Sequence, residues 1–513
     1  MSDFVLSRFD ELYVVSDIHM GGPSGFQILN QGPRLGALIR HLATVRPGER
    51  VGLVLNGDVV DSLAEDIDGY VAMDEAPRMM ERIYRDPAFA PIWDGLAAFV
   101  GAPGRRLVIA LGNHDIEMAL PSVESSIRTR LAGDDDAAQG RITFATQGMG
   151  FACLVGRARV FCTHGNEVDA WNIVDYDALR ELAISQNAGT PFDRAKWTPN
   201  AGTQLVKDVM NSVKRKYAWI DLLKPETQAA LGTLVVLDPG QAAKIEKITS
   251  ALSAYLNQIK GTLKVWGWLS ADDPTAAGMA QPQAPSLPQL LGPNLMGAVQ
   301  GPGTGASTDP AAMLRQAEHA LADPTRRRPV AAGTPETLGM TGMLWDRLRG
   351  VEPAEALRRA LLDWLAKDRS FDIAERDQTF RDVTSRVGAA VDFVVTGHTH
   401  LERALRIQDG ADRFYYNCGT WIRLLRFSDF VLGKPEEFRE VYQTLADGKM
   451  DTLDRATIPT AGGGRESFVL DRTTAVRISS QPDGVNGMLC HVHDARPGAI
   501  ELDPVAGSEF WRR

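Results

Sequence analysis

The sequence predicts a layered α/β fold, and three observations support this prediction. Short apolar runs alternate with helical patterns from the start of the chain to about Tyr176, which is typical of sheets covered by helices. The run Val51–Leu55 is rich in β-branched and aliphatic residues and ends at Asn56-Gly57, as a strand buried on both faces does. The alternation stops after His164 and returns near Val391. A large insertion therefore interrupts the predicted core.

Each element of the first part follows from its local pattern. Strands are expected where short apolar runs lie between turn residues, and helices where apolar residues recur every three or four positions. A hairpin is expected where the alternation reverses at Gly156-Arg157. In chain order, the expected elements are the strand Leu12–Val15, a helix at about Pro33–Ala43, the strand Val51–Leu55, helices near Pro77–Tyr84 and Pro91–Phe99, the strand Leu107–Leu111, a helix over Ser122–Leu131 and the hairpin Phe144–Thr163.

The insertion is expected to be mostly helical. Two stretches, Ala201–Leu223 and Gln241–Trp268, each place apolar residues on one helical face. The first also carries a basic cluster, Lys207–Lys216, on its other side. Packing within a helical subdomain is the expected role, and contact of a basic amphipathic helix with a lipid surface or an acyl substrate is the alternative. Residues 273–308 are rich in Pro, Ala, Gly and Gln and are expected to form a flexible loop.

The core is expected to resume with the strand Val391–Val395 and a hairpin formed by Arg403–Ile407 and Arg413–Asn417. The last part of the chain has one helical pattern near Glu436–Leu445 and several short strand patterns. It is expected to form a small α+β extension. The predicted domains are the first part of the core over 1–176, the helical insertion over 177–384, the second part of the core over 385–430 and the C-terminal extension over 431–513.

Length and composition limit the class of protein. At 513 residues the chain exceeds the usual size of one core, and its 44% hydrophobic and 23% charged content is ordinary for a soluble globular protein. The net charge of −10 argues against general affinity for nucleic acid backbones. We find no apolar run long enough to cross a membrane, no signal sequence, and only four cysteines. We therefore expect a cytoplasmic protein.

Five apolar runs end in residues that commonly bind metal ions. These runs are Leu12–His19, Val51–Asp61, Leu107–Asp115, Ala158–Asn166 and Val391–His400. Five of the nine histidines lie in them, a concentration that is not expected of histidines scattered through a core or a surface. Ligands of α/β sheets bind at the carboxyl ends of strands. The candidate metal ligands are Asp17, His19, Asp58, Asn113, His164, His398 and His400, and His114 is a candidate catalytic residue beside them.

This combination of residues suits a pair of divalent metal ions. Carboxylates and imidazoles together favour ions such as Mn²⁺, Fe²⁺, Co²⁺ or Zn²⁺, and Asp58 can bridge two of them through its two oxygens. Two ions about 3.5–4 Å apart can clamp a phosphoryl group and generate a bridging hydroxide at neutral pH. His114, next to the ligand Asn113, is free to protonate the leaving oxygen. Asp115 is placed to orient that imidazole.

The blocks DIH, NGDVVD, GNHD, THGN and GHTH resemble the five motifs of the calcineurin-like metallophosphoesterase superfamily, in the same order. The resemblance covers about residues 10–176 and 385–425. It implies a four-layer αββα sandwich with a dimetal centre at its edge, most simply with manganese and otherwise with Fe, Zn, Co or Ni. It further implies that Asp17, His19, Asp58 and His400 hold one metal, that Asp58, Asn113, His164 and His398 hold the other, and that His114, with Asp115 behind it, contacts phosphate or donates a proton.

The insertion is similar in position to the helical lid of the UDP-diacylglucosamine pyrophosphohydrolases of lipid A synthesis. It is much longer, and those enzymes commonly lack the histidine that is present here as His114. We expect a dimetal-dependent phosphohydrolase that cleaves a phosphodiester, phosphomonoester or pyrophosphate, with the insertion selecting a nucleotide- or lipid-linked substrate and providing any peripheral contact with lipid. The alternatives are a non-catalytic scaffold or binding protein with a metallophosphoesterase core, and a nuclease.

Overall fold

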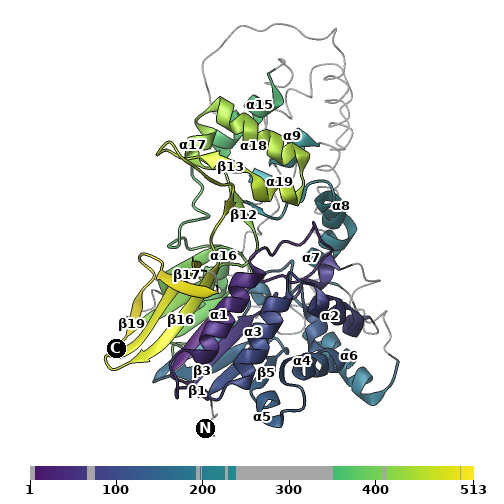
Figure 1. Cartoon of the computed structure of the whole chain (residues 1–513), viewed down its shortest axis with the longest axis vertical. Coiled ribbons are helices and arrows are strands. Elements are labelled where there is room, and N and C mark those ends of the chain that lie inside the picture. Colours follow the sequence, from purple (N-terminus) through teal and green to yellow (C-terminus); the bar gives the residue numbers. More distant parts are fainter. Residues whose placement is uncertain are drawn as a thin grey trace, which may run out of the picture. The chain divides into compact units, whose positions relative to one another are not determined.

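A computed structural model gives the architecture of the chain (Figure 1). It describes residues 6–65, 75–191, 197, 199–225, 229–230, 232–238, 351–407, 412–496 and 498–513. The chain divides into two compact units. The first comprises Met1–Thr203, Arg369–Arg423 and Asp471–Arg513, and the second comprises Gln204–Asp368 and Leu424–Leu470.

A large sheet in the first unit is built around four parallel strands, β2, β3, β4 and β5. Because neighbouring parallel strands run in one direction, their carboxyl ends lie along one edge of the sheet. Antiparallel strands from the C-terminal part of the chain continue the sheet beyond β2. In chain order the strands are β2 (Glu11–Val15), β3 (Val51–Asn56), β4 (Arg105–Ala110), β5 (Ile142–Ala145), β16 (Thr474–Gln481), β17 (Gly484–Arg496), β18 (Ala499–Pro504) and β19 (Phe510–Arg512).

A second sheet of the same unit has six strands in the order β1-β6-β7-β9-β11-β10. Its centre is parallel, because β7 pairs with β9 and β9 pairs with β11 in the same direction. The two hairpins expected from the sequence are present as β6–β7 and β10–β11. The strands are β1 (Ser7–Phe9), β6 (Phe151–Val155), β7 (Ala158–Cys162), β9 (Phe393–Thr396), β10 (Glu402–Ile407) and β11 (Arg413–Cys418).

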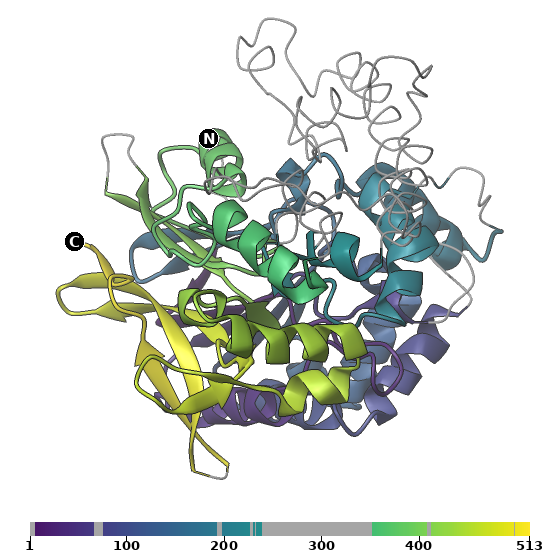
Figure 2. The same ribbon diagram turned by 90° about the horizontal axis from the view of Figure 1, so that it is seen from above.

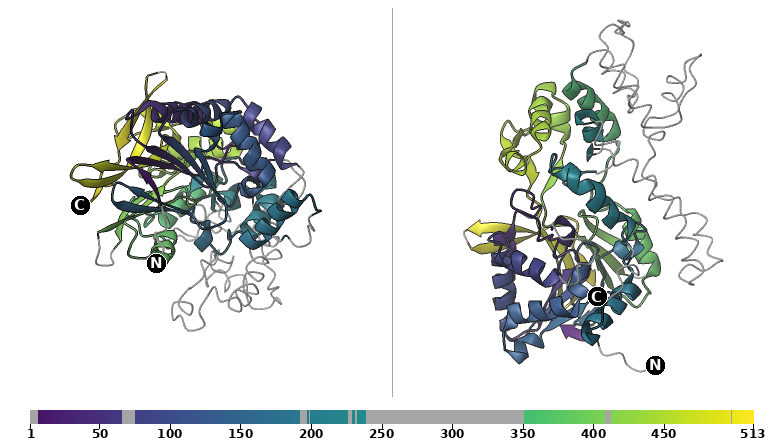
Figure 3. Two further views of the ribbon diagram at one scale, coloured as in Figure 1. Left: turned by 90° about the horizontal axis from the view of Figure 1, so that it is seen from below. Right: turned by 90° about the vertical axis from the view of Figure 1, so that its right-hand side faces the viewer.

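The alternation of side chains along β2 shows how the layers form. Leu12 and Val14 point into the core between the two sheets, whereas Tyr13 and Val15 point into the core under the helices. Helices cover the outer face of the large sheet, and α16 covers the outer face of the second sheet (Figure 3). The predicted four-layer αββα sandwich is confirmed. The helices of this unit are α1 (Gly32–Thr44), α2 (Ala76–Arg85), α3 (Ala90–Gly101), α4 (Pro121–Ala132), α5 (Asp136–Gln139), α6 (Tyr176–Ala188) and α16 (Gln378–Arg386), with short 3₁₀ turns η1 (Ser62–Ala64), η2 (Ile116–Ala119) and η3 (Asn166–Val168).

The outer helices follow from apolar spacing and from small residues at their contacts. In α1, Leu35, Leu38 and Leu42 recur at helical spacing and are fully buried. Gly36 lets α1 approach α3 closely, because a Cβ atom at this position would lie 2.2 Å from the carbonyl oxygen of Pro91. The helix over the large sheet is thus fixed by burial on one side and by close backbone packing along the other.

The second unit is mainly helical in its described part. Its helices α15 and α18 pack together, and Trp219 is fully buried and donates its indole N–H to the carbonyl oxygen of Leu445 at 2.7 Å. Its elements are α7 (Ala201–Leu205, which begins in the first unit), the π-helical turn η5 (Val206–Met210), α8 (Asn211–Lys214), β8 (Leu223–Lys224), α9 (Gly232–Leu237), α15 (Pro353–Trp364), β12 (Leu424–Arg426), α17 (Asp429–Leu432), α18 (Pro435–Asp447), α19 (Met450–Arg455), β13 (Thr457–Pro459), β14 (Arg465–Ser467) and β15 (Val469–Leu470).

The helix expected over Ala201–Leu223 ends earlier, at Lys214, and includes a π-helical turn. Its apolar residues Val209 and Val213 are buried, and Lys214 pairs with Asp221. The expected helix at 241–268 and the expected loop at 273–308 lie outside the described residues. Within the described part of the chain, no helix is long and apolar enough to span a membrane.

The C-terminal part differs from the single extension expected over 431–513. Residues up to Leu470 belong to the second unit, and the chain from Asp471 onward belongs to the first. The reason is strand pairing, because β16 pairs with β2 and buries Val476 and Ile478 in the core between the sheets. Figure 2 shows these strands in yellow at the C-terminal end of the colour scale. The short, weakly patterned strands at the end of the chain are therefore part of the sheet that carries the first motifs.

This arrangement predicts that a core substitution in β16 destabilises the first unit. Replacing Ile478, which is fully buried, by alanine should lower the free energy of unfolding by about 2–5 kcal/mol because it leaves a cavity. Ile184→Ala is the matched control, since Ile184 is 59% exposed. Urea unfolding measures both variants. Equal, small effects would contradict the integration of the C-terminal strands into the core.

Candidate metal centre

The predicted ligands follow the carboxyl ends of neighbouring strands in both sheets. Three of these strands, β2, β3 and β4, are parallel neighbours in the large sheet, and β7 and β9 are parallel neighbours in the second sheet. Parallel strands bring the residues that follow them to one edge. Asp17 and His19 follow β2, Asp58 follows β3, Asn113 and His114 follow β4, His164 follows β7, and His398 and His400 follow β9.

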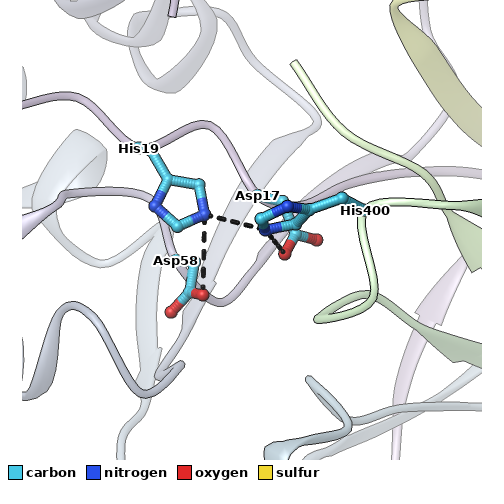
Figure 4. Close-up of side chains that lie close together, drawn as sticks. All are labelled: Asp17, His19, Asp58 and His400. Carbon is cyan, nitrogen blue, oxygen red and sulfur yellow. Dashed lines mark hydrogen bonds and ion pairs between the residues drawn. The ribbon is translucent and has the colours of Figure 1, made fainter. Parts of the chain in front are cut away.

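Four of these residues form a first ligand group, Asp17, His19, Asp58 and His400, with one potential ligand atom from each within 4.8 Å of the others (Figure 4). The Nε2 atoms of His19 and His400 face each other at 3.2 Å. Nε2 of His400 also lies 3.3 Å from Oδ1 of Asp17, and Nε2 of His19 lies 3.7 Å from Oδ2 of Asp58. Two imidazoles and two carboxylates thus converge on one point.

A second ligand group consists of Asp58, His164 and His398, again with ligand atoms within 4.8 Å of one another. Nε2 of His164 lies 3.2 Å from Oδ2 of Asp58, the same oxygen that faces His19. Asn113 is buried, and its Oδ1 atom has no hydrogen-bond partner among the described residues. The two groups therefore share one carboxylate oxygen.

The backbone holds most of these ligands in an uncommon conformation. Six described residues other than glycine have positive φ, and five of them are candidate ligands. Asp and His are several-fold enriched among non-glycine residues with left-handed backbone. This conformation still costs free energy, so the surrounding structure must enforce it. Residues in such conformations cluster at functional sites. The five are Asp17 and His19 (both φ 54°), Asp58 (51°), His398 (71°) and His400 (61°).

Hydrogen bonds outside the two groups fix the ligand atoms. Oδ1 of Asp58 accepts the backbone N–H of His114 at 2.9 Å, which leaves Oδ2 for the shared position. Nδ1 of His164 lies 2.8 Å from the carbonyl oxygen of Asn56. Because a carbonyl only accepts, Nδ1 of His164 carries a proton, and Nε2 is the atom that a metal ion would bind. This is the usual arrangement of a metal-binding histidine.

The donor set fits two divalent transition-metal ions. It combines buried imidazole nitrogens, carboxylate oxygens and the unpaired amide oxygen of Asn113. Such a mixed N/O set suits ions of the Mn²⁺ to Zn²⁺ series. An unpaired buried oxygen is costly unless another group satisfies it, and a metal ion would do so at Asn113. The residues present therefore match the metals that the motifs imply.

Residues 11–220 match the calcineurin-like phosphoesterase family. This match, together with the Asp/His groups at the edge of the sheets, supports a metallophosphoesterase core. No curated protein matches the chain. His398 and His400 lie beyond the matched residues, and the pairing of β7 with β9 brings them to the ligands of the first part. Phosphoesterase-type chemistry and metal binding are thus the functional class of the core.

The imidazole of His114 contacts a carboxylate that sequence reasoning did not assign. Nδ1 of His114 lies 3.1 Å from Oδ1 of Asp61, and Nδ1 of His19 lies 3.6 Å from Oδ2 of Asp61. Asp115, which we expected to orient His114, accepts the backbone N–H groups of Gly112 and Val59, both at 2.7 Å. Asp61, and not Asp115, therefore orients the imidazole of His114. The signal was present in the sequence, because Asp61 ends the block NGDVVD.

Two further residues were also missed. Asp169 accepts from Nε2 of His398 at 2.9 Å, and Asn172 contacts both Asp169 and Asn113. They lie five and eight positions after His164, in a stretch with no strand pattern. A lone Asp or Asn in such a stretch is more often a turn residue, so no sequence pattern distinguished these two residues from others.

Burial and nearby opposite charges shift the pKa values of several groups in this centre. Burial raises the pKa of Asp58, but the nearby His164, His114 and His19 outweigh burial and hold the pKa well below its usual value. Burial lowers the pKa of His164, but the Asp58 carboxylate raises it to about 10. Burial and the charge of Asp58 raise the pKa of Asp115 to about 7. Binding of a metal ion to His164 would therefore displace a proton from this side chain.

A glycine next to the ligands provides a test of the shared carboxylate. A Cβ atom at Gly112 would lie 2.1 Å from Oδ1 of Asp58, so Gly112→Ala should displace Asp58. Because both ligand groups use Asp58, binding of both Mn²⁺ ions should weaken by about 10- to 100-fold, as measured by titration of the metal-free protein. Gly101→Ala is the matched control, because no atom lies within 4 Å of its added Cβ. Wild-type binding by the Gly112 variant would contradict the shared role of Asp58.

Proposed function

We propose that the chain is a dimetal-dependent phosphohydrolase that cleaves a phosphodiester, phosphomonoester or pyrophosphate. The observation that carries this proposal is the position of Asp58 Oδ2, which lies between His19 of one ligand group and His164 of the other. A shared carboxylate places two ions side by side, as enzymes that displace groups at phosphorus require. All eight residues implied by the family motifs are present.

The proposed ligands of the first metal are Asp17, His19, Asp58 and His400, and those of the second are Asp58, Asn113, His164 and His398. Divalent ions held there would neutralise the charge of a phosphoryl group and activate a water molecule as the nucleophile. Mn²⁺ is the proposed ion, and Fe, Zn, Co and Ni share the same ligand preferences. The centre has more neutral ligands than carboxylates, so that two bound ions keep a net positive charge toward an anionic substrate.

His114 is the proposed proton donor to the leaving oxygen. Its side chain is 18% exposed, whereas the side chains of His19 and His164 are at most 1% exposed. The side chains of His398 and His400 are 11% and 15% exposed, but both are proposed metal ligands, which leaves His114 as the exposed histidine proposed to act on substrate. Asp61 faces Nδ1 of His114, and this carboxylate stabilises the imidazolium form that donates the proton. In this proposal, the carboxylate of Asp115 stabilises the turns that contain Gly112 and Val59 by accepting their backbone N–H groups.

The insertion is proposed to select the substrate, with a nucleotide- or lipid-linked phosphate as the expected class. Its place between the fourth and fifth motifs supports this role, because segments inserted at this point of the chain join two ligand-bearing strands. The basic cluster gives little support to binding of lipid or nucleic acid, because Lys214 pairs with Asp221 and Lys216 pairs with Asp238. The net charge of −10 also argues against binding of nucleic acid.

Hydrolysis assays with added Mn²⁺ test the proposal. The panel contains an aryl phosphodiester, an aryl phosphomonoester, a nucleotide-sugar pyrophosphate, a lipid-linked pyrophosphate and single-stranded DNA. His114→Ala should lower kcat by about 10²–10⁴-fold with both metals retained, because it removes only the proton donor. Asp58→Ala should abolish both turnover and metal binding. His41→Ala is the control, because His41 lies on the exposed side of α1.

Three outcomes would contradict the proposal. Unchanged turnover in Asp58→Ala or His114→Ala would show that hydrolysis does not occur at this metal centre. Two bound ions without turnover of any substrate would favour a scaffold or binding protein built on this core. Turnover confined to single-stranded DNA would contradict the nucleotide- or lipid-linked substrate class, though not the phosphodiester chemistry, and would favour a nuclease.

A further inference from the structure

The second metal group relies on neutral ligands more than the first group does. The first group contains two carboxylates, Asp17 and Asp58, whereas the second contains only Asp58, which it shares. Asn113, His164 and His398 are uncharged when they bind a metal. With less negative charge to attract an ion, the second group depends on how firmly its neutral ligands are oriented. Residues that orient Asn113 and His398 should therefore decide whether the second ion stays bound.

We propose that Asp169 and Asn172 are positioning residues that hold two ligands of the second metal, an inference that rests on the proposed function. They form one hydrogen-bonded relay, His398–Asp169–Asn172–Asn113. Both ends of the relay are ligands that belong to the second group alone. The relay thus positions ligands of the second metal only. Asp17 and His400, which belong to the first group, are not part of it.

At one end, Oδ2 of Asp169 lies 2.9 Å from Nε2 of His398. The carboxylate accepts the Nε2 proton, so Nδ1 of His398 keeps the lone pair that binds a metal. A carboxylate partner also makes an imidazole more basic and fixes the plane of its ring. Asp169 therefore supplies, from outside the ligand set, negative charge that the second group lacks.

At the other end, Nδ2 of Asn172 donates to Oδ2 of Asp169 at 2.7 Å, and Oδ1 of Asn172 accepts from Nδ2 of Asn113 at 3.4 Å. The second of these bonds is long, but its direction decides which way the Asn113 amide points. With Nδ2 of Asn113 directed at Asn172, its Oδ1 atom is left without a partner in the described structure. That oxygen is the proposed ligand.

The segment that carries the relay is itself fixed on several sides. Oδ1 of Asp169 accepts the backbone N–H of Trp171 at 3.0 Å, and Asn166 donates to the carbonyl oxygen of Asn172 at 3.0 Å. Gly202 donates its N–H to the carbonyl oxygen of Trp171 at 2.8 Å, and a Cβ atom at Gly202 would lie 2.1 Å from Oδ1 of Asn172. The relay is therefore built into the packing of this loop.

Titration of the metal-free, full-length protein with Mn²⁺ tests the proposal. Calorimetry gives the number of ions and their affinities, and electron paramagnetic resonance distinguishes a coupled Mn²⁺ pair from a single ion. The variants are Asp169→Asn, which keeps the shape and removes the charge, and Asn172→Ala, which cuts the relay. Asp175→Asn is the matched control, because Asp175 is an exposed carboxylate that caps α6 and asparagine caps equally well.

The wild-type chain and Asp175→Asn should bind two Mn²⁺ ions. Asp169→Asn should bind one ion with unchanged affinity and the second about 10- to 100-fold more weakly, with the spectrum of a single ion at low Mn²⁺. Asn172→Ala should change the second ion in the same direction. Unchanged binding of both ions in these two variants, or equal weakening of both ions, would overturn the relay. Fewer than two ions in the wild-type chain would instead overturn the proposed function, and the relay with it.

Discussion

The position of one carboxylate oxygen determines the rest of this centre. Oδ2 of Asp58 faces histidines of both ligand groups, and Oδ1 is occupied by a backbone N–H of the turn that carries Asn113 and His114. Asp58 is buried, so its charge must be compensated by groups that contact it directly. The surrounding histidines, and the metal ions that they would share, provide this compensation. The strands and turns of the core bring these groups to Asp58.

The fold supplies this convergence at a cost in backbone conformation. The ligands follow parallel strands of two sheets, and five of them adopt positive φ, which aims their side chains at a common point. The packed layers make this possible, because the strands that precede the ligands are mostly buried and cannot shift without opening the core. Glycines at the turns then remove the Cβ atoms that would collide with Asp58 and His164. The packed core thus stabilises the positive-φ backbone of the ligands at the edge of the sheets.

Much of this arrangement could be predicted from the sequence, because each motif combines an apolar strand with polar residues at its end. The layered α/β core and the closeness of the ligands follow from these local patterns, and the four-layer sandwich follows from the family resemblance of the motifs. Asp61 ends one of the motifs, but its contact with His114 is made across the fold and was not assigned. The contacts of Asp169 with His398 and of Asn172 with Asn113 join residues far apart in sequence, and no local pattern marks them. The last strands were also misplaced, since short strands at an edge carry a weak pattern until their partner, β2, is known. The lid role of the insertion remains a prediction.

The most direct test of the shared carboxylate is crystallographic. Crystals of the chain loaded with Mn²⁺, measured with anomalous scattering, should show two peaks about 3.5–4 Å apart, with Oδ2 of Asp58 as a ligand of both ions. A single peak, or two peaks with Asp58 bound to only one of them, would contradict the bridging role of Asp58 and the dimetal centre built around it.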